Sequence, residues 1–356
     1  MKKKLLFTGT FFLATLLIFA QNPRNVLVYN LTSTDCGPCS CMDSILIHKV
    51  LPQYPNTIIV ALHGMGSGFN TYQGDSARNF FHANYEPSGF IDGLGKDCPY
   101  IKIADSVDNR YQTAPDAPVK ISVDHKDWDA ATRQVDLTVT FTNIGDEMNG
   151  SYWFNVIVQE DHIKHTHRTM QGCSTPDVPN LPFCNNYFNN WVTRMMVFWS
   201  QGDSLIGPSW PGEQAVTRSC SFSIDTAWIP ENCYIVVNVY RKSDSLYKSP
   251  VQQVIRQSVT GGSAISEASA MIEGIINIFP NPATYMANLH FSLSREAFCS
   301  LSIYDMRGIE IENILKGNIT PGLYNIEIDT HTYPAGTYIA VLTTNMGKTR
   351  RKLIIL

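Results

Sequence analysis

Two cysteines separated by two residues constrain the fold of this chain more than any other feature. The motif Cys36-Gly37-Pro38-Cys39 follows the apolar run 26–29 and precedes a segment, 42–51, that can be helical. This order predicts that both thiols lie at a helix N-terminus, where free backbone N–H groups and the helix dipole stabilise a thiolate. We expect Cys36 to attack and Cys39 to resolve.

A strand, a CxxC dithiol and a helix in this order resemble a thioredoxin-like module. The second half of such a module should supply a proline that faces the dithiol. Pro87 is the best candidate, because a short apolar strand and a turn glycine follow it in 88–93. We expect a cis peptide bond before Pro87. The expected catalytic residues are therefore Cys36, Cys39 and Pro87.

Three residues depart from the thioredoxin pattern. Asp35 stands where thioredoxins carry a tryptophan, and its carboxylate opposes thiolate formation. Asn30 lies near the position of a buried acid that helps the second thiol lose its proton, and an amide cannot accept that proton. Glu86 adds a further negative charge facing the dithiol. These departures leave two functions open: thiol–disulfide exchange, or a non-catalytic surface or secreted binding protein in which the CxxC is a structural disulfide.

The N-terminus indicates export. Three lysines at 2–4, an apolar stretch over 5–19 and Ala20 before polar residues are typical of a secretory signal peptide, residues 1–20. An uncleaved membrane anchor is the alternative, but the apolar stretch is short for a span. No later segment is expected to cross a bilayer, so we predict no transmembrane span after cleavage. Nine cysteines suit an oxidising compartment.

Composition and the pattern of apolar residues predict a multidomain chain of α/β plus all-β units. With 356 residues the chain is too long for one ordinary core. A net charge of -4, without a basic cluster outside the two ends, argues against nucleic acid as a partner. Residues 22–115 mix strands and helices, as a thioredoxin-like domain would. Residues 116–257 alternate with period two, as in a β-sandwich, and residues 258–274 have the composition of a linker.

The last unit, residues 275–356, is expected to be an immunoglobulin-like β-sandwich. Its short motifs occur in a fixed order: 280–282 (PNP), 303–305 (IYD) with Gly308, 322–324 (GLY), 334–338 (PAGTY) and 352–355 (KLII). In this order they resemble a type IX secretion sorting domain of type A. The resemblance implies the translocon and a sortase-like peptidase as partners of residues 275–356. It also implies passage through the periplasm to the cell surface (outer membrane) or the medium. If the Cys36–Cys39 dithiol exchanges disulfides, its expected partners are disulfide-containing client proteins.

Residues 22–257 resemble the secreted outer-membrane-protein-twenty-eight-related family. The resemblance rests on the signal peptide, the strand-CxxC-helix module, 60–63 (VALH), 87–93, 187–194 and 228–233 (WIPENC). It implies a thioredoxin-like fold and an exported location, and it implies no particular reaction.

The remaining cysteines and a histidine group complete the candidates. Spacing suggests three further bridges, Cys173–Cys184, Cys220–Cys233 and Cys41–Cys98, with Cys299 left over, although spacing alone cannot fix connectivity. His162, His165 and His167 lie close together, but on a strand His162 would point away from the other two. We therefore predict no metal site and no cofactor. His63 is expected to be structural, within reach of Cys36.

Overall fold

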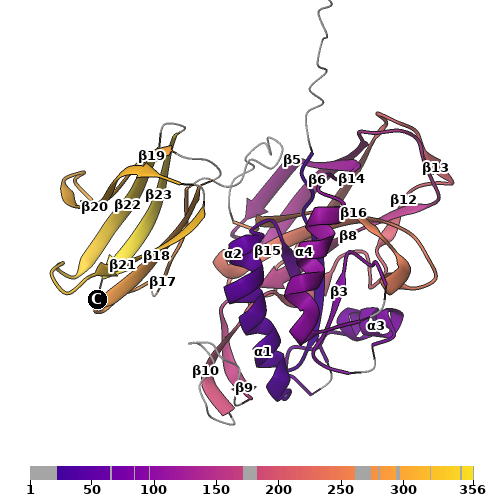
Figure 1. Cartoon of the computed structure of the whole chain (residues 1–356), viewed down its shortest axis with the longest axis horizontal. Helices are drawn as coiled ribbons and strands as arrows, with labels where there is room; N and C mark the ends of the chain where they lie inside the picture. The colour runs from indigo at the N-terminus through magenta and orange to yellow at the C-terminus, as the bar shows by residue number, and fades with distance from the viewer. Residues whose placement is uncertain are drawn as a thin grey trace, which may run out of the picture.

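The computed structural model describes residues 22–64, 66–83, 85–95, 97–170, 183–260, 274–279, 281–293, 297–320, 322–344 and 347–355. The expected signal peptide, residues 1–20, and most of the expected linker, residues 258–274, lie outside the described residues. Among the described helices, none has both the length and the apolar character needed to cross a membrane. Figure 1 shows a larger unit of helices and strands and a smaller all-β unit in orange and yellow.

The larger unit begins as an alternation of strands and helices and continues almost entirely as strands. Its elements are β1 (Leu27–Thr32), α1 (Gly37–Ile45), the π-helical turn η1 (Leu46–Val50), α2 (Leu51–Gln53), β2 (Ile58–His63), α3 (Tyr72–Phe81), β3 (Ser88–Ile91), β4 (Cys98–Pro99), η2 (Tyr100–Lys102), α4 (Ile103–Thr113), β5 (Val119–Asp129), β6 (Gln134–Asn143), β7 (Met148–Asn149), β8 (Tyr152–Glu160), β9 (Ile163–Arg168), β10 (Phe183–Asn189), β11 (Val192–Met196), β12 (Asp203–Ile206), β13 (Ser209–Trp210), β14 (Ala215–Ser223), η3 (Pro230–Asn232), β15 (Cys233–Arg241), η4 (Leu246–Lys248) and β16 (Val251–Ser258).

One large sheet organises this unit. Within the described residues it has nine strands in the order β16-β15-β8-β11-β2-β1-β3-β4, with β12 paired beside β8. β1 and β2 are parallel, whereas β3 runs antiparallel to β1 and β4 antiparallel to β3. The parallel pair is connected through α1, because parallel strands need a crossover connection. The dithiol lies in this crossover.

Alternation along β1 explains how the helices attach. Val26 and Val28 share a core with Met42 of α1 and Val107 of α4. The intervening residues of β1 point to the opposite face, where Tyr29 packs against Phe81 of α3 with 4.7 Å between ring centroids. Both faces of β1 are therefore buried, which is why its sequence is almost continuously apolar.

A buried ion cluster fixes the end of β3 against β1 and α4. Asp92 has no exposed surface, and its carboxylate accepts a hydrogen bond from the backbone N–H of Leu27 at 2.7 Å. The same carboxylate contacts Arg110 of α4 at 2.7 Å and Arg24 at 3.6 Å. Burial raises the pKa of Asp92, and Arg110 opposes that shift. The cluster ties three elements that are far apart in sequence.

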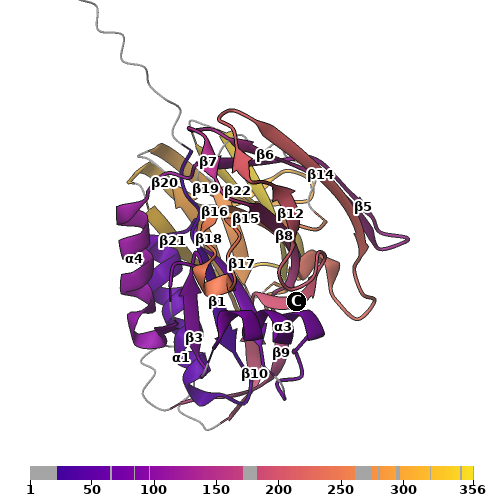
Figure 2. The same cartoon turned by 90° about the vertical axis from the view of Figure 1, so that its right-hand side faces the viewer.

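The expected boundary between residues 115 and 116 does not interrupt the sheet. Val192 of β11 pairs in parallel with Ala61 of β2, and through it β8, β15 and β16 continue the sheet begun by β1 and β2. A second, three-stranded sheet, β14-β6-β5, lies over β8 and β15, as Figure 2 shows. Side chains of these strands form one apolar core. Alternation predicts these strands, but it carries no information about which distant strand they pair with.

The smaller unit is a sandwich of two antiparallel sheets. Its strands are β17 (Gly274–Phe279), β18 (Met286–Leu293), β19 (Ala297–Asp305), β20 (Glu310–Ile319), β21 (Gly322–Asp329), β22 (Gly336–Thr344) and β23 (Gly347–Ile355). Among the described residues the sheets have the orders β17-β18-β21 and β20-β19-β22-β23. Phe291, Leu301 and Leu353 meet in a shared core. The all-β unit expected for residues 275–356 thus corresponds to these two sheets.

We predict that Asp92→Asn lowers the free energy of unfolding of the larger unit by about 3–5 kcal/mol, because it leaves two partly buried arginines without a counter-charge. Asparagine also tolerates the positive φ of 48° at this position, so the substitution isolates the loss of charge. Urea unfolding followed by tryptophan fluorescence reports on the larger unit alone, since all six tryptophans precede residue 229.

The exposed Asp146→Asn is the matched control and should change this free energy by less than about 0.5 kcal/mol. An Asp92→Asn protein as stable as the unsubstituted chain would show that the cluster does not hold the elements together.

Candidate functional site

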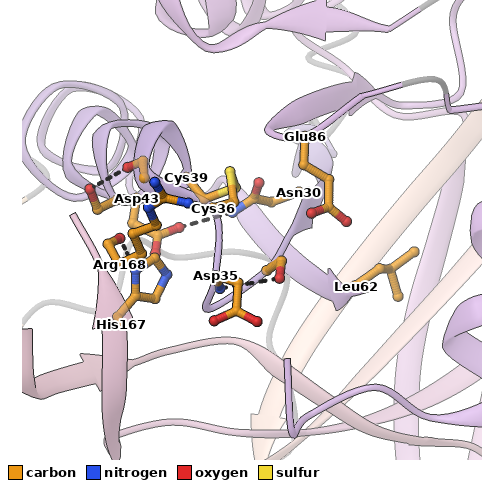
Figure 3. The surroundings of a disulfide bond; sticks show 12 residues. Asn30, Asp35, Cys36, Cys39, Asp43, Leu62, Glu86, His167 and Arg168 are labelled. Carbon is orange, nitrogen blue, oxygen red and sulfur yellow. Dashed lines mark hydrogen bonds between the residues drawn. A yellow bond between two sulfur atoms is a disulfide. The ribbon is translucent and has the colours of Figure 1, made fainter. Parts of the chain in front are cut away.

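The two cysteines of the motif lie at the start of α1 and are joined to each other. The Cys36 and Cys39 Sγ atoms form a disulfide with an S–S distance of 2.09 Å, and their Cα atoms are 5.3 Å apart (Figure 3). Cys36 is the residue immediately before α1 and is partly exposed, whereas Cys39 lies inside the first turn and has no exposed surface. One sulfur is therefore accessible from outside and the other is not.

The loop that carries Cys36 is held from two sides. The Cys36 N–H donates to the Ser33 carbonyl at 3.2 Å, which closes the turn before the helix. The Thr34 hydroxyl donates to the Ser67 carbonyl at 2.9 Å, and the Thr34 carbonyl accepts from the Arg168 N–H at 2.7 Å. The loop after β2 and the end of β9 thus fix the position of the disulfide.

The Glu86–Pro87 segment lies against the disulfide. The peptide bond between these residues is cis, which confirms that expectation, and Pro87 is buried. A carboxylate oxygen of Glu86 and the sulfurs of Cys36 and Cys39 all lie within 4.8 Å of one another. Glu86 is also paired with Arg78. Burial raises the pKa of Glu86 and Arg78 opposes the shift, so the charge expected to face the dithiol is partly balanced.

A hollow opens in front of Cys36. Its lining includes Asp35, Cys36, Pro38, Glu86, Arg168 and Met170. Arg168 and Met170 come from the far half of the chain, at the end of β9, and nothing in the sequence pattern places them near the CxxC motif. Charges of both signs therefore surround the accessible sulfur.

A buried polar cluster lies near the disulfide. Asn30 of β1 has no exposed surface, and its Nδ2 donates to Asp43 of α1 at 3.0 Å (Figure 3). Tyr187 of β10 donates its hydroxyl to the other Asp43 oxygen at 2.9 Å. Burial is the main cause that raises the pKa of Asp43, and His167 acts in the opposite direction. Sequence reasoning missed Asp43, although its position four residues after Cys39 places it on the same helix face.

The histidine group does not form one site. His165 is exposed and contacts the Phe69 ring at a centroid distance of 4.9 Å. His167 is buried and contacts the Tyr187 ring in a tilted arrangement, with the centroids 4.3 Å apart. His162 precedes β9 and is exposed. Within the described part of the chain, the convergent group of possible metal ligands is instead Cys36, Cys39 and Glu86. Because a disulfide consumes both thiolates, this group offers no thiolate ligand in the oxidised state.

The further cysteine bridges suggested by spacing are wrong. Cys220 and Cys233 do not bridge, and Cys184 and Cys98 each carry a free thiol. The Cys98 sulfur instead lies 3.3 Å from the Ser106 hydroxyl. Burial raises the pKa of the Cys220 thiol to about 11 and that of the Cys233 thiol to about 12, so neither is a reactive thiolate near neutral pH.

Cys41 is disulfide-bonded, and its partner is not Cys98. Cys173, for which a bridge to Cys184 was expected, lies outside the described residues. Cys299 is buried in the core of the smaller unit.

Comparison with known families identifies the smaller unit. Residues 277–356 match the family described as a secretion system C-terminal sorting domain. This match agrees with the resemblance inferred for residues 275–356. The protein is an exported one, handled by the type IX secretion system and destined for the cell surface or outer-membrane region.

Among solved structures, HBP35 of Porphyromonas gingivalis is similar in fold. The similarity covers 94% of this chain and 99% of that chain, with a TM-score of 0.53 and 12% sequence identity. A protein of Agrobacterium tumefaciens matches 69% of this chain and 99% of its own, with a TM-score of 0.41 and 11% identity. No curated protein sequence matches the chain.

We predict a pH dependence of stability that originates at His63. This side chain is buried at the end of β2, against Phe69, and burial lowers the pKa of His63 to about 3. Below about pH 6.5 the unfolded chain binds a proton that the folded chain does not. The free energy of unfolding should therefore fall as the pH falls from 6.5 towards 3, by up to about 1.4 kcal/mol per pH unit.

His63→Asn should reduce the slope of the free energy of unfolding against pH by the contribution of one proton. Urea unfolding at a series of pH values measures this slope. Substitution of the exposed His125 by asparagine should leave the slope much closer to that of the unsubstituted protein. An identical slope with and without the His63 imidazole would refute the assignment.

Proposed function

We propose that residues 22–257 form a thioredoxin-like redox module that exchanges disulfides with other proteins at the cell surface. Cys36 is the sulfur attacked by the client, Cys39 is the resolving thiol, and Pro87 shapes the groove beside them. The observation that carries the proposal is the joined Cys36–Cys39 pair at the N-terminus of α1, with the partly exposed Cys36 facing a hollow bordered by Glu86.

The order of elements supports this proposal. The dithiol follows β1, the next strand β2 is parallel to β1, and β3 and β4 form an antiparallel pair beside β1 before α4 closes the unit. This is the strand–helix arrangement expected of a thioredoxin-like module. The similarity of fold to HBP35 of P. gingivalis extends over nearly the whole chain and is compatible with it, but at 12% identity it carries no statement about activity.

Starting from the oxidised state, the exchange is balanced without a further reagent. A client thiolate attacks the Cys36 sulfur, the Cys36–Cys39 bond breaks, and Cys39 leaves with the bonding electron pair and takes up a proton. A second client thiolate then attacks the client sulfur of the mixed disulfide and releases Cys36. The client is oxidised to a disulfide and the protein is reduced to a dithiol, and the reverse sequence reduces a client disulfide.

The remaining organisation follows from export. We propose that the signal peptide, residues 1–20, is removed during passage into the periplasm. A sortase-like peptidase then removes the sorting domain, residues 275–356. The mature protein would contain the redox module alone, in the medium or attached to the cell surface.

A second candidate function is a non-catalytic binding protein in which this disulfide only stiffens the loop. The complete burial of Cys39 and the hydrogen bonds that clamp residues 33–36 favour it. The two candidates differ in the reduction potential of the pair, which lies below about -300 mV for structural disulfides and nearer -120 to -270 mV for exchangers.

We predict that the protein catalyses reduction of the insulin disulfides by dithiothreitol, and that Cys36→Ser returns the rate to that of dithiothreitol alone. In Cys39→Ser the mixed disulfide on Cys36 cannot be resolved, so clients should accumulate on it and be released by reductant on a non-reducing gel. Cys98→Ser, which removes a free thiol of the same unit, is the control and should retain the activity.

If the unsubstituted protein is no faster than dithiothreitol alone and Cys39→Ser traps nothing, the exchange function is excluded and the binding protein remains.

A separate prediction concerns export. Deletion of residues 275–356 should leave the protein in the periplasm, because the sorting domain is the address for the last step. Cell fractionation with an antibody against the larger unit measures this, and the full-length chain is the control. Normal appearance of the truncated protein at the surface would show that another segment directs export.

A further inference from the structure

We propose that Asp43 supplies a proton to the Cys39 sulfur when the disulfide opens and takes it back when the disulfide closes. The inference deepens the exchange function proposed above, and it assigns a role to a residue that lies outside the CxxC motif. It rests on three features of the described structure: the place of Asp43 on α1, its hydrogen bonds, and an unpartnered atom of Asn30.

Asp43 is carried by the same helix as the dithiol. Cys39 and Asp43 are four residues apart within α1, so their side chains are neighbours on one helix face, with Cβ atoms about 5–6 Å apart. Cys39 has no exposed surface and therefore no direct contact with water. When Cys39 leaves as a thiolate, the proton that neutralises it has to come from a group inside the protein. Glu86 has a carboxylate oxygen within 4.8 Å of both sulfurs, but it is paired with Arg78. Asp43 lies on the same helix face as Cys39, and its hydrogen-bond donors Asn30 and Tyr187 are neutral.

Asn30 is hydrogen-bonded to Asp43 and lies beside the disulfide. Its Nδ2 donates to Asp43 at 3.0 Å, whereas its Oδ1 is buried and has no hydrogen-bond partner. An unpartnered buried carbonyl oxygen is costly unless some state of the protein satisfies it. Figure 3 shows Asn30 among the residues that surround the disulfide. The thiol of reduced Cys39 is a donor that the oxidised state lacks, and Asn30 can accept from it while it orients Asp43.

The groups that face Asp43 are neutral near pH 7, so they allow its carboxyl group to gain and lose a proton. β10 contributes the Tyr187 hydroxyl, which donates at 2.9 Å, and β9 contributes His167. Burial lowers the pKa of His167, which keeps this imidazole neutral near pH 7. β1 contributes only the neutral Asn30. Burial raises the pKa of Asp43, so the carboxyl group holds a proton more readily than an exposed aspartate does.

The direct test measures the Cys39 thiol without any turnover. In Cys36→Ser the disulfide cannot form, and the ¹³Cβ chemical shift of Cys39 follows its ionisation. Because ionised Asp43 opposes the Cys39 thiolate, Asp43→Asn in this background should lower the pKa of Cys39 by about one unit or more. Asp108→Asn is the matched control, since Asp108 also accepts from a tyrosine, Tyr54, but lies on α4. It should leave the Cys39 titration unchanged.

A second measurement addresses the proton transfer. The rate at which dithiothreitol reduces the oxidised protein, recorded by stopped flow from pH 5 to 8, should fall about 10-fold or more in Asp43→Asn at the low-pH end, where the carboxyl group is protonated. Asp43→Glu should restore part of the rate. Tyr187→Phe removes a hydrogen bond that favours the ionised carboxylate, so it should move the pH profile to higher pH.

The experiments separate the role of Asp43 from the disulfide-exchange function. Identical Cys39 titrations and identical rate profiles with aspartate or asparagine at position 43 overturn the role of Asp43, even if the protein exchanges disulfides. A protein that does not reduce insulin overturns the exchange function, whereas the titration of Cys39 still shows whether Asp43 is coupled to it.

Discussion

The architecture depends on how the edge of β2 is paired. An unpaired β2 would expose a row of backbone N–H and C=O groups beside the site. Instead, the Ala61 N–H donates to the Trp191 carbonyl at 2.9 Å, next to the pairing of β11 with β2. Gln159 of β8 spans the junction, since its buried Nε2 donates to the carbonyls of Ile59 and Trp191. This junction makes one sheet from two stretches with different sequence textures, and it carries the β9–β10 hairpin to the dithiol.

Local features of the fold and of the site could be predicted because they depend on neighbouring residues. The motif begins a helix at Gly37, and Pro87 follows a cis bond. Pairings between distant segments could not be predicted, because alternation gives the face of a strand and not its neighbour. The predicted cysteine pairings were wrong for the same reason, because the separation of two cysteines in the sequence does not give the distance between their Cα atoms in the fold.

The same distinction between local and distant residues applies to the site. The sequence identified Cys36, Cys39 and Glu86, which the structure brings within 4.8 Å of one another. It also noted that Asn30 replaces an acid, but it could not show that this amide donates to a carboxylate on the facing helix. Arg168 and Tyr187 are separated from the motif by more than 120 residues and come close to it only through the hairpin. No local pattern encodes such proximity.

The hairpin has a consequence for how this protein can be divided. In many multidomain chains a module can be excised at its boundary and retain its chemistry. Here a cut after residue 115 would remove the Arg168 contact to Thr34 and the Tyr187 contact to Asp43. It would also remove β11, one of the two neighbours of β2. The fragment would keep both sulfurs but lose one wall of their surroundings. The smallest segment that keeps the surroundings of the disulfide intact is therefore the larger unit from β1 to β16.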